Sequence, residues 1–195
     1  MCCLSTVAIF RQPSILRNLV CPLATRPEEQ DQGRRFARLA QVLGHWIGDI
    51  HRPLYVLADD RGGNSIRVTA CAPNLHAIWD TCIIEKKLGT DPQTIAQDLL
   101  DGLPDSDRAA WVAVPIAGWA NESFQVTRRK SVQYCVRVGT KCFYQQGNET
   151  FSEGEDEKVV IVDTAYLKQH VPFVRDRLKR AGIRLADLLN RTLGQ

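Results

Sequence analysis

Two histidine–aspartate pairs with the same spacing place the strongest constraint on how this chain folds. Asp49 follows His45 by four positions, and Asp80 follows His76 by four positions. On a helix this spacing puts both side chains on one face, close enough to share a metal ion. A neutral imidazole beside a carboxylate is a common part of a zinc site. One such pair is most simply a surface ion pair. Two pairs that bracket a Gly-Gly-Asn loop favour metal binding.

The residues around these pairs resemble the signature of a known enzyme family. Residues 45–68 read HWIGDIHRPLYVLADDRGGNSIRV, and residues 74–84 read NLHAIWDTCII. This pattern is similar to that of the S1/P1 nucleases, which are zinc-dependent phosphodiesterases related in fold to bacterial phospholipase C. Weaker similarity follows in later segments, and the resemblance runs from about Gly33 to the C terminus. It implies a mostly α-helical domain of the phospholipase C/P1 nuclease type, with one short β-hairpin.

The resemblance implies a role for each member of the two pairs. The family holds three zinc ions in a cleft. His45 would bind one ion, and Asp49 would bridge that ion to a second, which makes Asp49 the expected catalytic residue. His76 and Asp80 would bind the third ion. We therefore expect zinc on these four residues, and the metal that an incomplete centre retains to sit on His76 and Asp80.

Three residues near the pairs depart from the family pattern or have a less certain role. Tyr55 stands where the third zinc ion normally has a histidine ligand, and a phenol with an ordinary pKa near ~10 is a poor ligand. Arg52 stands where glutamine is usual, and a cation there would weaken metal binding. His51 is not a direct ligand in the family, so we expect it to support a ligand or to stack.

The segment before His45 lacks the other ligands that the resemblance implies. Residues 1–44 contain no histidine, and Asp31 is their only aspartate. Four of about nine expected ligand positions are present, which leaves one or two incomplete zinc sites. The sequence resembles the C-terminal two-thirds of a nuclease with an unrelated or frame-altered start. A second chain, a longer gene product or water would have to fill the gaps.

The Gly62-Gly63-Asn64 loop is the expected substrate-binding segment. Two glycines allow a backbone to approach a ligand closely. Taken alone, the same residues would indicate only a tight turn between two elements.

Composition indicates one ordinary globular domain. The chain has 195 residues, of which 44% are hydrophobic and 24% are charged, and its net charge of +3 is too small to argue for nucleic acid by itself. Of seven cysteines, Cys135 and Cys142 could close a hairpin, whereas Cys71 and Cys82 could be bridged or merely buried. No pair has the C-x-x-C spacing of a structural zinc site.

The family is secreted or periplasmic, but this sequence gives no convincing signal peptide. Arg11, Pro13 and Arg17 interrupt the apolar residues near the start. No apolar run is long enough to span a membrane. The start as given would keep the protein inside the cell, whereas a start further upstream would be expected to add a signal peptide.

Hydrophobic periodicity predicts the organisation of the chain. Residues 1–33 are expected to be poorly ordered, and residues 34–195 to form the helical domain. Apolar residues at Phe36, Leu39, Trp46 and Ile47 predict a helix with one buried face that ends at Pro53. The other expected elements are a turn over 59–64, a strand over 65–70, helices over 75–87, 91–103 and 111–124, a hairpin strand at 136–138, and one or two helices over 163–192 with Pro172 as a kink and Gly182 as a break.

The sequence thus predicts a zinc-dependent endonuclease that cuts single-stranded DNA and RNA to 5′-phosphate products. The alternative is a degenerate, non-catalytic relative or a gene fragment, which keeps the scaffold and binds zinc or nucleic acid weakly at most. Tyr55 and the missing ligands favour the alternative. Neither a membrane nor a particular oligomeric state is indicated.

Overall fold

The computed structural model describes residues 27–56, 60–134, 136–138, 141–143 and 159–193. The predicted mostly α-helical class is confirmed. The described elements are α2 (Pro27–His51), η1 (Pro53–Val56), α3 (Asp60–Gly63), β1 (Arg67–Val68), α4 (Leu75–Ala77), η2 (Ile78–Cys82), α5 (Ile83–Lys87), α6 (Pro92–Leu100), α7 (Asp105–Val112), α8 (Ile116–Thr127), η3 (Lys130–Val132), β2 (Val136–Val138), β3 (Lys141–Phe143), β4 (Val159–Val160) and α9 (Thr164–Leu193).

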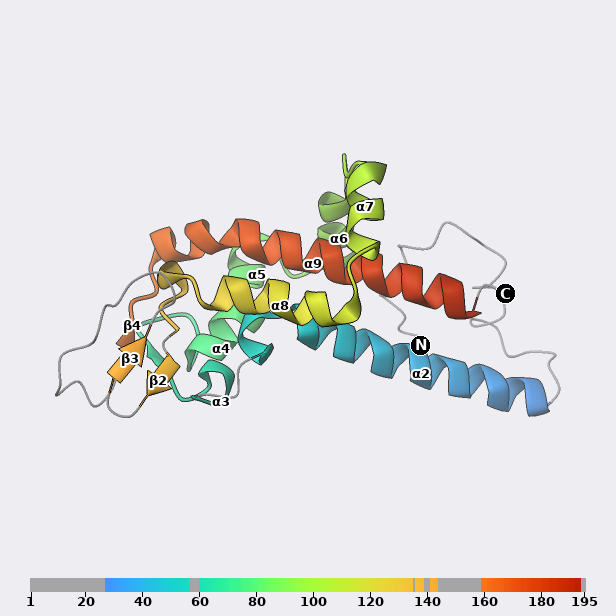
Figure 1. Ribbon diagram of the computed structural model, residues 1–195, viewed down its shortest axis with the longest axis horizontal. Helices are drawn as coiled ribbons and strands as arrows, with labels where there is room; N and C mark the ends of the chain where they lie inside the picture. The colour runs from blue at the N-terminus through green and yellow to red at the C-terminus, as the bar shows by residue number, and fades with distance from the viewer. Residues whose placement is uncertain (1–26, 57–59, 135, 139–140, 144–158, 194–195) are drawn as a thin grey trace.

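Three long helices form the frame of the molecule. Helix α2 packs against α8 and also packs along α9. Figure 1 shows α9 running antiparallel to α2 and α8, with α6 and α7 above it and the β2–β3 hairpin at one end. The short elements α3, α4 and η1 are gathered at the C-terminal end of α2, so that the end of this helix meets the second His–Asp segment.

Helix α2 begins at Pro27, earlier than the predicted start at residue 34. Proline is well suited to a first helical position, because the amide there has no partner within the helix. The helix ends at His51, since Pro53 follows. Residues 1–26 lie outside the described residues, so the disorder expected there stays a prediction.

The apolar face predicted for α2 is only partly buried. Ile47 is buried, but Trp46 is 66% exposed and Leu39 is 59% exposed. The strip that faces α9 includes Gly44, where an added Cβ would lie 3.6 Å from Leu185. Because Trp46 and Leu39 lie around the helix from this strip, periodicity alone overestimated the width of the buried face.

The second ligand helix is confirmed, with a local departure from α-helical geometry. Elements α4, η2 and α5 together cover Leu75–Lys87, and the Asn74 side chain caps the start by accepting a hydrogen bond from the Ala77 amide at 2.9 Å. The five residues Ile78–Cys82 form a single π-helical stretch. Such stretches often occur at functional sites, and Asp80 lies within this one.

The helix predicted over residues 111–124 is wrong as a single element. Trp111 belongs to α7, and a new helix, α8, begins at Ile116. Pro115 explains the break, since its ring lacks an amide donor and disfavours helical geometry at Val114. The helix predicted over 91–103 is shorter than expected, with Asp91 as its cap.

Helix α9 continues through both residues that were expected to interrupt it. Pro172 lies inside it, and Gly182 does not end it. The Asp163 carboxylate caps its start by accepting from the Tyr166 amide at 2.7 Å. Packing of Tyr166 and Val174 in the core outweighs the local cost of the proline.

Two small sheets complete the described part of the chain. Strand β1 pairs in parallel with β4, joining Arg67 to Val159 and Val68 to Val160. Strands β2 and β3 form the predicted antiparallel hairpin. The suggested disulfide between Cys135 and Cys142 cannot be placed, because residue 135 lies outside the described residues.

The hydrophobic core lies under the second ligand helix and the start of α9. Trp79 and Ile83 are buried there, as predicted, and Trp119 is buried beneath α8. A disulfide joins Cys71 to Cys82 and ties the loop before α4 to the end of η2. Among the described residues, no helix combines the length and apolar character needed to cross a membrane. The core cluster contains Leu54, Ile66, Leu75, Ile78, Trp79, Cys82, Ile83, Val126, Val132, Tyr134, Val160, Val162, Tyr166 and Val174.

Candidate metal centre

The first His–Asp pair lies on the outward side of α2, near its end. His45 Nε2 is 3.3 Å from Asp49 Oδ2, and the two side chains are 72% and 26% exposed. The helical spacing therefore brings the two groups together, as predicted. His45 is open to solvent, whereas Asp49 is half-buried.

The second pair is more enclosed and is oriented by the glycine loop. His76 Nε2 lies 3.1 Å from Asp80 Oδ2, with 16% and 18% of the side chains exposed. His76 Nδ1 is 2.8 Å from the Gly62 carbonyl oxygen. Because a carbonyl only accepts, Nδ1 carries the proton and donates it, which turns Nε2 toward Asp80.

Arg52 lies between the carboxylates of the two pairs. Its Nη1 atom is 3.2 Å from Asp80 Oδ2 and 4.0 Å from Asp49 Oδ1. The turn after α2 carries Arg52 toward η2, and so the two pairs meet at one place although they come from different helices. This contact brings both predicted half-sites into a single cluster.

Tyr55 joins the same cluster as a hydrogen-bonding group. Its hydroxyl accepts from Arg52 Nη1 at 2.9 Å and donates to Asp80 Oδ2 at 3.2 Å. Its ring also packs on His76, with centroids 4.6 Å apart. Burial and the negative charge of Asp80 raise the pKa of the phenol, so Tyr55 stays protonated and acts as a donor.

The described donor set does not make up a complete zinc site. Catalytic zinc usually has three protein ligands, and structural zinc has four. Across the described ranges, no three His, Cys, Asp or Glu side chains are placed to share one ion. Each His–Asp pair offers two donors, and a guanidinium lies between their carboxylates. The geometry is that of two half-sites.

The Gly62-Gly63-Asn64 loop has a structural role beside the one predicted for it. Gly62 and Gly63 have φ values of 65° and 87°, in the left-handed region. At Gly63 an added Cβ would lie 3.3 Å from the His76 amide nitrogen. Asn64 is exposed, and its side chain donates to the Arg61 carbonyl at 2.9 Å. The two glycines thus allow the loop to approach and hold His76.

His51 belongs to a different cluster from the one expected. Its Nδ1 donates to the Ile47 carbonyl at 2.8 Å, and its Nε2 accepts from Arg184 Nη1 at 2.8 Å. With both nitrogens engaged, the ring has no donor atom for a metal. Burial lowers the pKa of His51 to about 4, which keeps it neutral. His51 therefore does not support the ligands of the His–Asp pairs.

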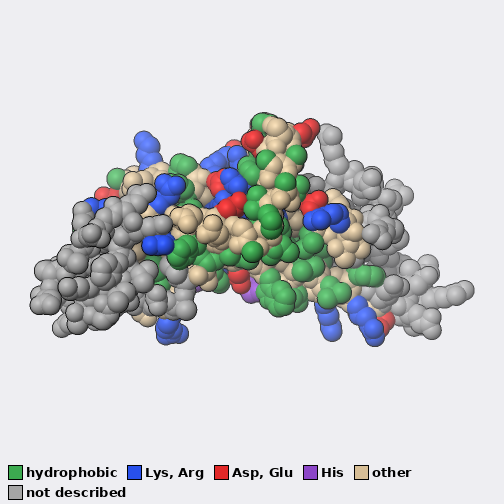
Figure 2. Space-filling model, in the orientation of Figure 1, with side chains coloured by type: hydrophobic (Ala, Val, Ile, Leu, Met, Phe, Trp, Pro, Cys, Tyr) green, Lys and Arg blue, Asp and Glu red, His purple; other side chains and the backbone are tan. Residues whose placement is uncertain are grey.

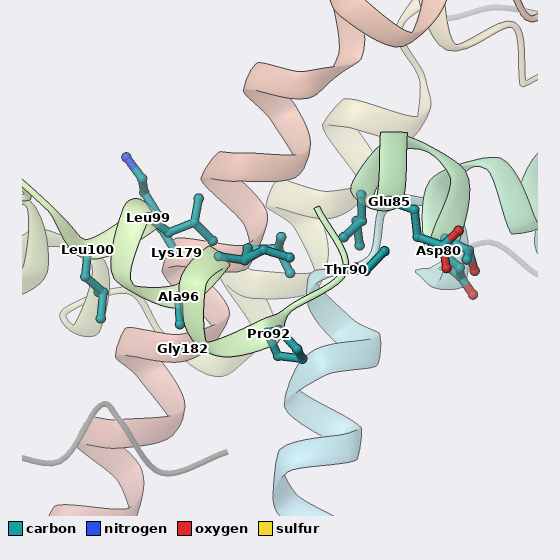
Figure 3. A pocket seen from close by; sticks show the side chains of 13 residues that line it. Asp80, Glu85, Thr90, Pro92, Ala96, Leu99, Leu100, Lys179 and Gly182 are labelled. Carbon is teal, nitrogen blue, oxygen red and sulfur yellow. The ribbon is translucent and has the colours of Figure 1, made fainter. Parts of the chain in front are cut away.

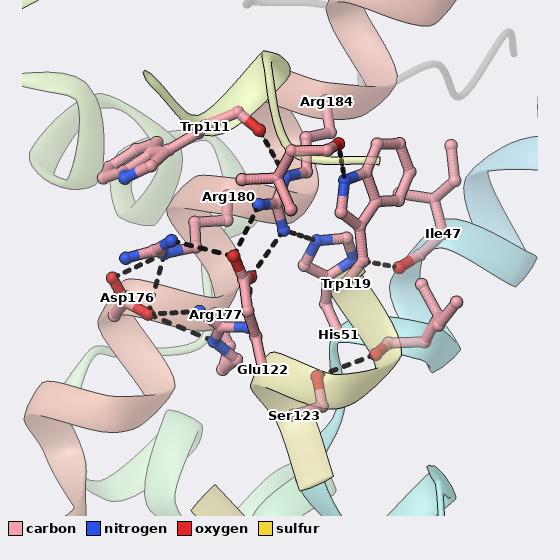
Figure 4. A network of polar contacts seen from close by, with 12 residues as sticks. Ile47, His51, Trp111, Trp119, Glu122, Ser123, Asp176, Arg177, Arg180 and Arg184 are labelled. Carbon is pink, nitrogen blue, oxygen red and sulfur yellow. Dashed lines mark hydrogen bonds and ion pairs between the residues drawn. The ribbon is translucent and has the colours of Figure 1, made fainter. Parts of the chain in front are cut away.

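The cluster around His51 is a charge network that joins three helices. Glu122 of α8 pairs with Arg177, Arg180 and Arg184 of α9, the last through two hydrogen bonds of 2.7 and 2.9 Å (Figure 4). Burial raises the pKa of Glu122, but the hydrogen bonds and charges of Arg184 and Arg177 outweigh it and lower the value to about 2. The sequence analysis missed this network, although three arginines at helical spacing in α9 were a signal for it.

A pocket adjoins the metal centre at Asp80. It has a volume of about 410 Å³, and its walls come from α5, α6 and α9 (Figure 3). Its lining is mainly aliphatic, with Asp80 at one end and Leu100 toward the other. Figure 2 shows acidic and histidine side chains together at the lower edge of the visible face, beside hydrophobic ones.

Comparison with known proteins identifies the family of this chain. A family model described as "S1/P1 Nuclease" matches residues 14–194. The chain belongs to the S1/P1 nuclease family. The match starts before Gly33, where the sequence resemblance was expected to begin. Members of this family are hydrolases that act on phosphodiester bonds.

Relatives from plants and fungi support the same membership. Endonuclease 4 of Arabidopsis thaliana is 33% identical over 155 residues, covering 76% of this chain and 48% of the relative. Endonuclease 2 of the same plant is 31% identical over 155 residues, covering 78% and 50%. Nuclease S1 of Aspergillus oryzae (strain ATCC 42149 / RIB 40) is 25% identical over 171 residues, covering 83% and 56%. The chain spans about half the length of the curated relatives it matches, less than the two-thirds expected.

Proposed function

We propose that this S1/P1 family member acts as a zinc-dependent endonuclease on single-stranded DNA and RNA, leaving 5′-phosphate products. The observation that carries the proposal is the meeting of the two His–Asp pairs. Arg52 Nη1 contacts Asp80 at 3.2 Å and reaches Asp49 at 4.0 Å, so carboxylates from α2 and η2 converge on one point. Convergent carboxylates and imidazoles are the donors expected at such a centre.

His45 and Asp49 are the metal ligands that we propose first. The His45 side chain is open to solvent and that of Asp49 is half-buried, and their donor atoms lie 3.3 Å apart. Asp49 would also be the carboxylate shared between metal ions, as the family resemblance implies. His76 and Asp80 form the second half-site. The remaining ligands would have to come from outside the described residues.

The loop and the pocket are proposed to contact the nucleic acid. Asn64 is exposed next to the Gly62 carbonyl that holds His76, so its amide could meet a substrate beside the centre.

The Cys71–Cys82 disulfide supports an oxidising compartment for the protein, since such bonds persist there.

The second candidate function is binding of single-stranded nucleic acid without hydrolysis. The hydrogen bonds of Arg52 and Tyr55 to Asp80 favour it, because they occupy a carboxylate oxygen that a metal would need. A degenerate family member would keep the scaffold and the charge network while losing the metal.

The full chain can distinguish the two functions by its zinc content and its activity. We would measure zinc per chain by elemental analysis and cleavage of a fluorescent single-stranded DNA, using the parent, Asp49→Asn and Asp107→Asn, an exposed control on α7. The proposal expects bound zinc, cleavage, and a loss of about 10–100-fold in Asp49→Asn alone. DNA binding without zinc or cleavage would establish the second function.

A further inference from the structure

We propose that the guanidinium of Arg52 is the resident cation of the His76–Asp80 pair and excludes zinc from it, so that His45–Asp49 is the pair that takes metal. This inference rests on the proposed metal-dependent function and refines it. It states which of the two half-sites this chain has kept for a divalent cation.

The Oδ2 atom of Asp80 is already occupied by hydrogen-bond donors. This one oxygen accepts from Arg52 Nη1 at 3.2 Å and from the Tyr55 hydroxyl at 3.2 Å, and it lies 3.1 Å from His76 Nε2. Three groups therefore surround the oxygen that would bind a metal together with His76. A metal ion would have to displace Arg52 and Tyr55 before it could bind there.

The position of Arg52 is held by more than its ion pair. Its Nη1 also donates to the Tyr55 hydroxyl at 2.9 Å, and its guanidinium lies 5.1 Å from the centre of the Tyr55 ring. Tyr55 in turn packs on His76. Several contacts therefore hold the guanidinium, and its charge lies beside Asp80.

The electrostatic consequence is direct. A guanidinium is charged at every physiological pH. A divalent cation bound between His76 and Asp80 would lie a few ångströms from this charge, and the repulsion is strong at a half-buried site. Arg52 therefore both occupies the carboxylate and opposes any competing cation.

The first pair differs in its hydrogen bonds and in the exposure of its histidine. Asp49 Oδ1 is 4.0 Å from Arg52 Nη1, beyond hydrogen-bond distance, and the other oxygen of Asp49 faces His45 at 3.3 Å. The His45 side chain is 72% exposed. A metal can therefore reach this pair from solvent without breaking a charged hydrogen bond.

The test is a titration of the chelator-treated full chain with zinc, monitored by calorimetry. Cobalt(II) absorption provides a second readout of the same site. The variants are Arg52→Gln, which removes the charge, Arg52→Lys, which keeps it, and Arg35→Gln as a control. Arg35 forms an ion pair with the exposed Asp31 on α2 and lies several helical turns before Arg52. Circular dichroism melting would show that each variant is folded.

We expect the parent to bind zinc through Asp49, so that Asp49→Asn weakens binding and Asp80→Asn does not. Arg52→Gln should add a second zinc, or tighten binding at least about tenfold, and adding Asp80→Asn should remove that gain. Arg52→Lys and Arg35→Gln should behave like the parent. A parent whose zinc depends on Asp80, or an Arg52→Gln protein that binds no more zinc than the parent, overturns the inference.

The result is separable from that of the proposed function. If Arg52→Gln gains an Asp80-dependent zinc but no protein cleaves single-stranded DNA, the inference stands and the nuclease proposal fails. If the parent cleaves DNA and Arg52→Gln gains no zinc, the nuclease proposal stands and the inference fails. Absence of zinc from every variant also contradicts the inference, since removal of the charge should open the pair.

Discussion

Arg184 donates a hydrogen bond to His51 Nε2 at 2.8 Å, across 133 positions of the sequence. The contact requires a neutral imidazole, because a protonated ring would have no lone pair to accept it. The contact joins the C-terminal end of α2 to α9. It therefore helps to determine the position of the first His–Asp pair, which lies on the last turns of α2.

This contact predicts that the protein loses stability in mild acid. The pKa of His51 is about 4 in the folded state and 6.5 in the unfolded state. Between these values the unfolded chain binds more protons, so the free energy of unfolding falls as pH drops from 6.5 to 4, by about 3 kcal/mol in total. Urea unfolding across this range should show the loss. A His51→Gln protein should lack this component, and His45→Gln, which changes an exposed histidine of the same helix, should keep it.

The charge network predicts a large cost for removing Glu122. In Glu122→Gln the fully buried Arg184 loses its carboxylate partner while remaining charged. We expect a loss of about 3 kcal/mol in the free energy of unfolding. Chemical denaturation at neutral pH would measure it, with Glu85→Gln, an exposed residue of α5, as the matched control. Equal stability of both variants would show that Glu122 does not hold the helices together.

The glycine loop predicts opposite effects for two alanine substitutions. Gly63→Ala places a side chain at a φ of +87°, 3.3 Å from the His76 amide nitrogen, and should cost about 1–3 kcal/mol. Gly48→Ala meets nothing within 4 Å inside α2 and should stabilise the protein by about 0.5–1 kcal/mol. Thermal melting of both proteins tests the pair of effects. A stable Gly63→Ala protein would mean that the loop can rearrange around His76.

The Cys71–Cys82 disulfide predicts a stability that depends on redox conditions. The bond closes a loop with a sequence separation of 11, which corresponds to about 3 kcal/mol of chain entropy. The double variant Cys71→Ser/Cys82→Ser should have a free energy of unfolding lower by about this amount. Reductant should lower the free energy of unfolding of the parent but change that of the variant little. If reductant lowers the free energy of unfolding of the parent and the variant equally, the effect comes from other cysteines.

Features set by local spacing could be predicted from the sequence. The i, i+4 spacing placed His45 beside Asp49 and His76 beside Asp80. The break between α7 and α8 was not predicted, although Pro115, which restricts both itself and Val114, is a local signal for it. Local rules of this kind hold wherever neighbouring residues decide the conformation.

Features set by tertiary contacts could not be predicted in this way. The sequence indicated that Arg52 would oppose a metal, but not that it would bond Asp80, 28 positions away. His51 was expected to support a ligand or to stack, but the sequence did not indicate that the helix turns it toward Arg184. Exposure of Trp46 likewise depends on which elements cover α2, and periodicity carries no information on that point.

The central claim is that this chain carries a metal-dependent phosphodiesterase centre with His45 and Asp49 as its metal ligands. The most direct measurement is cleavage of single-stranded DNA by chelator-treated full chain as zinc is added back, with the 5′ ends of the products identified. The account predicts that activity returns with zinc, that products carry 5′-phosphates, and that His45→Ala and Asp49→Asn abolish the return. No cleavage at saturating zinc, or cleavage unchanged by both substitutions, would contradict it.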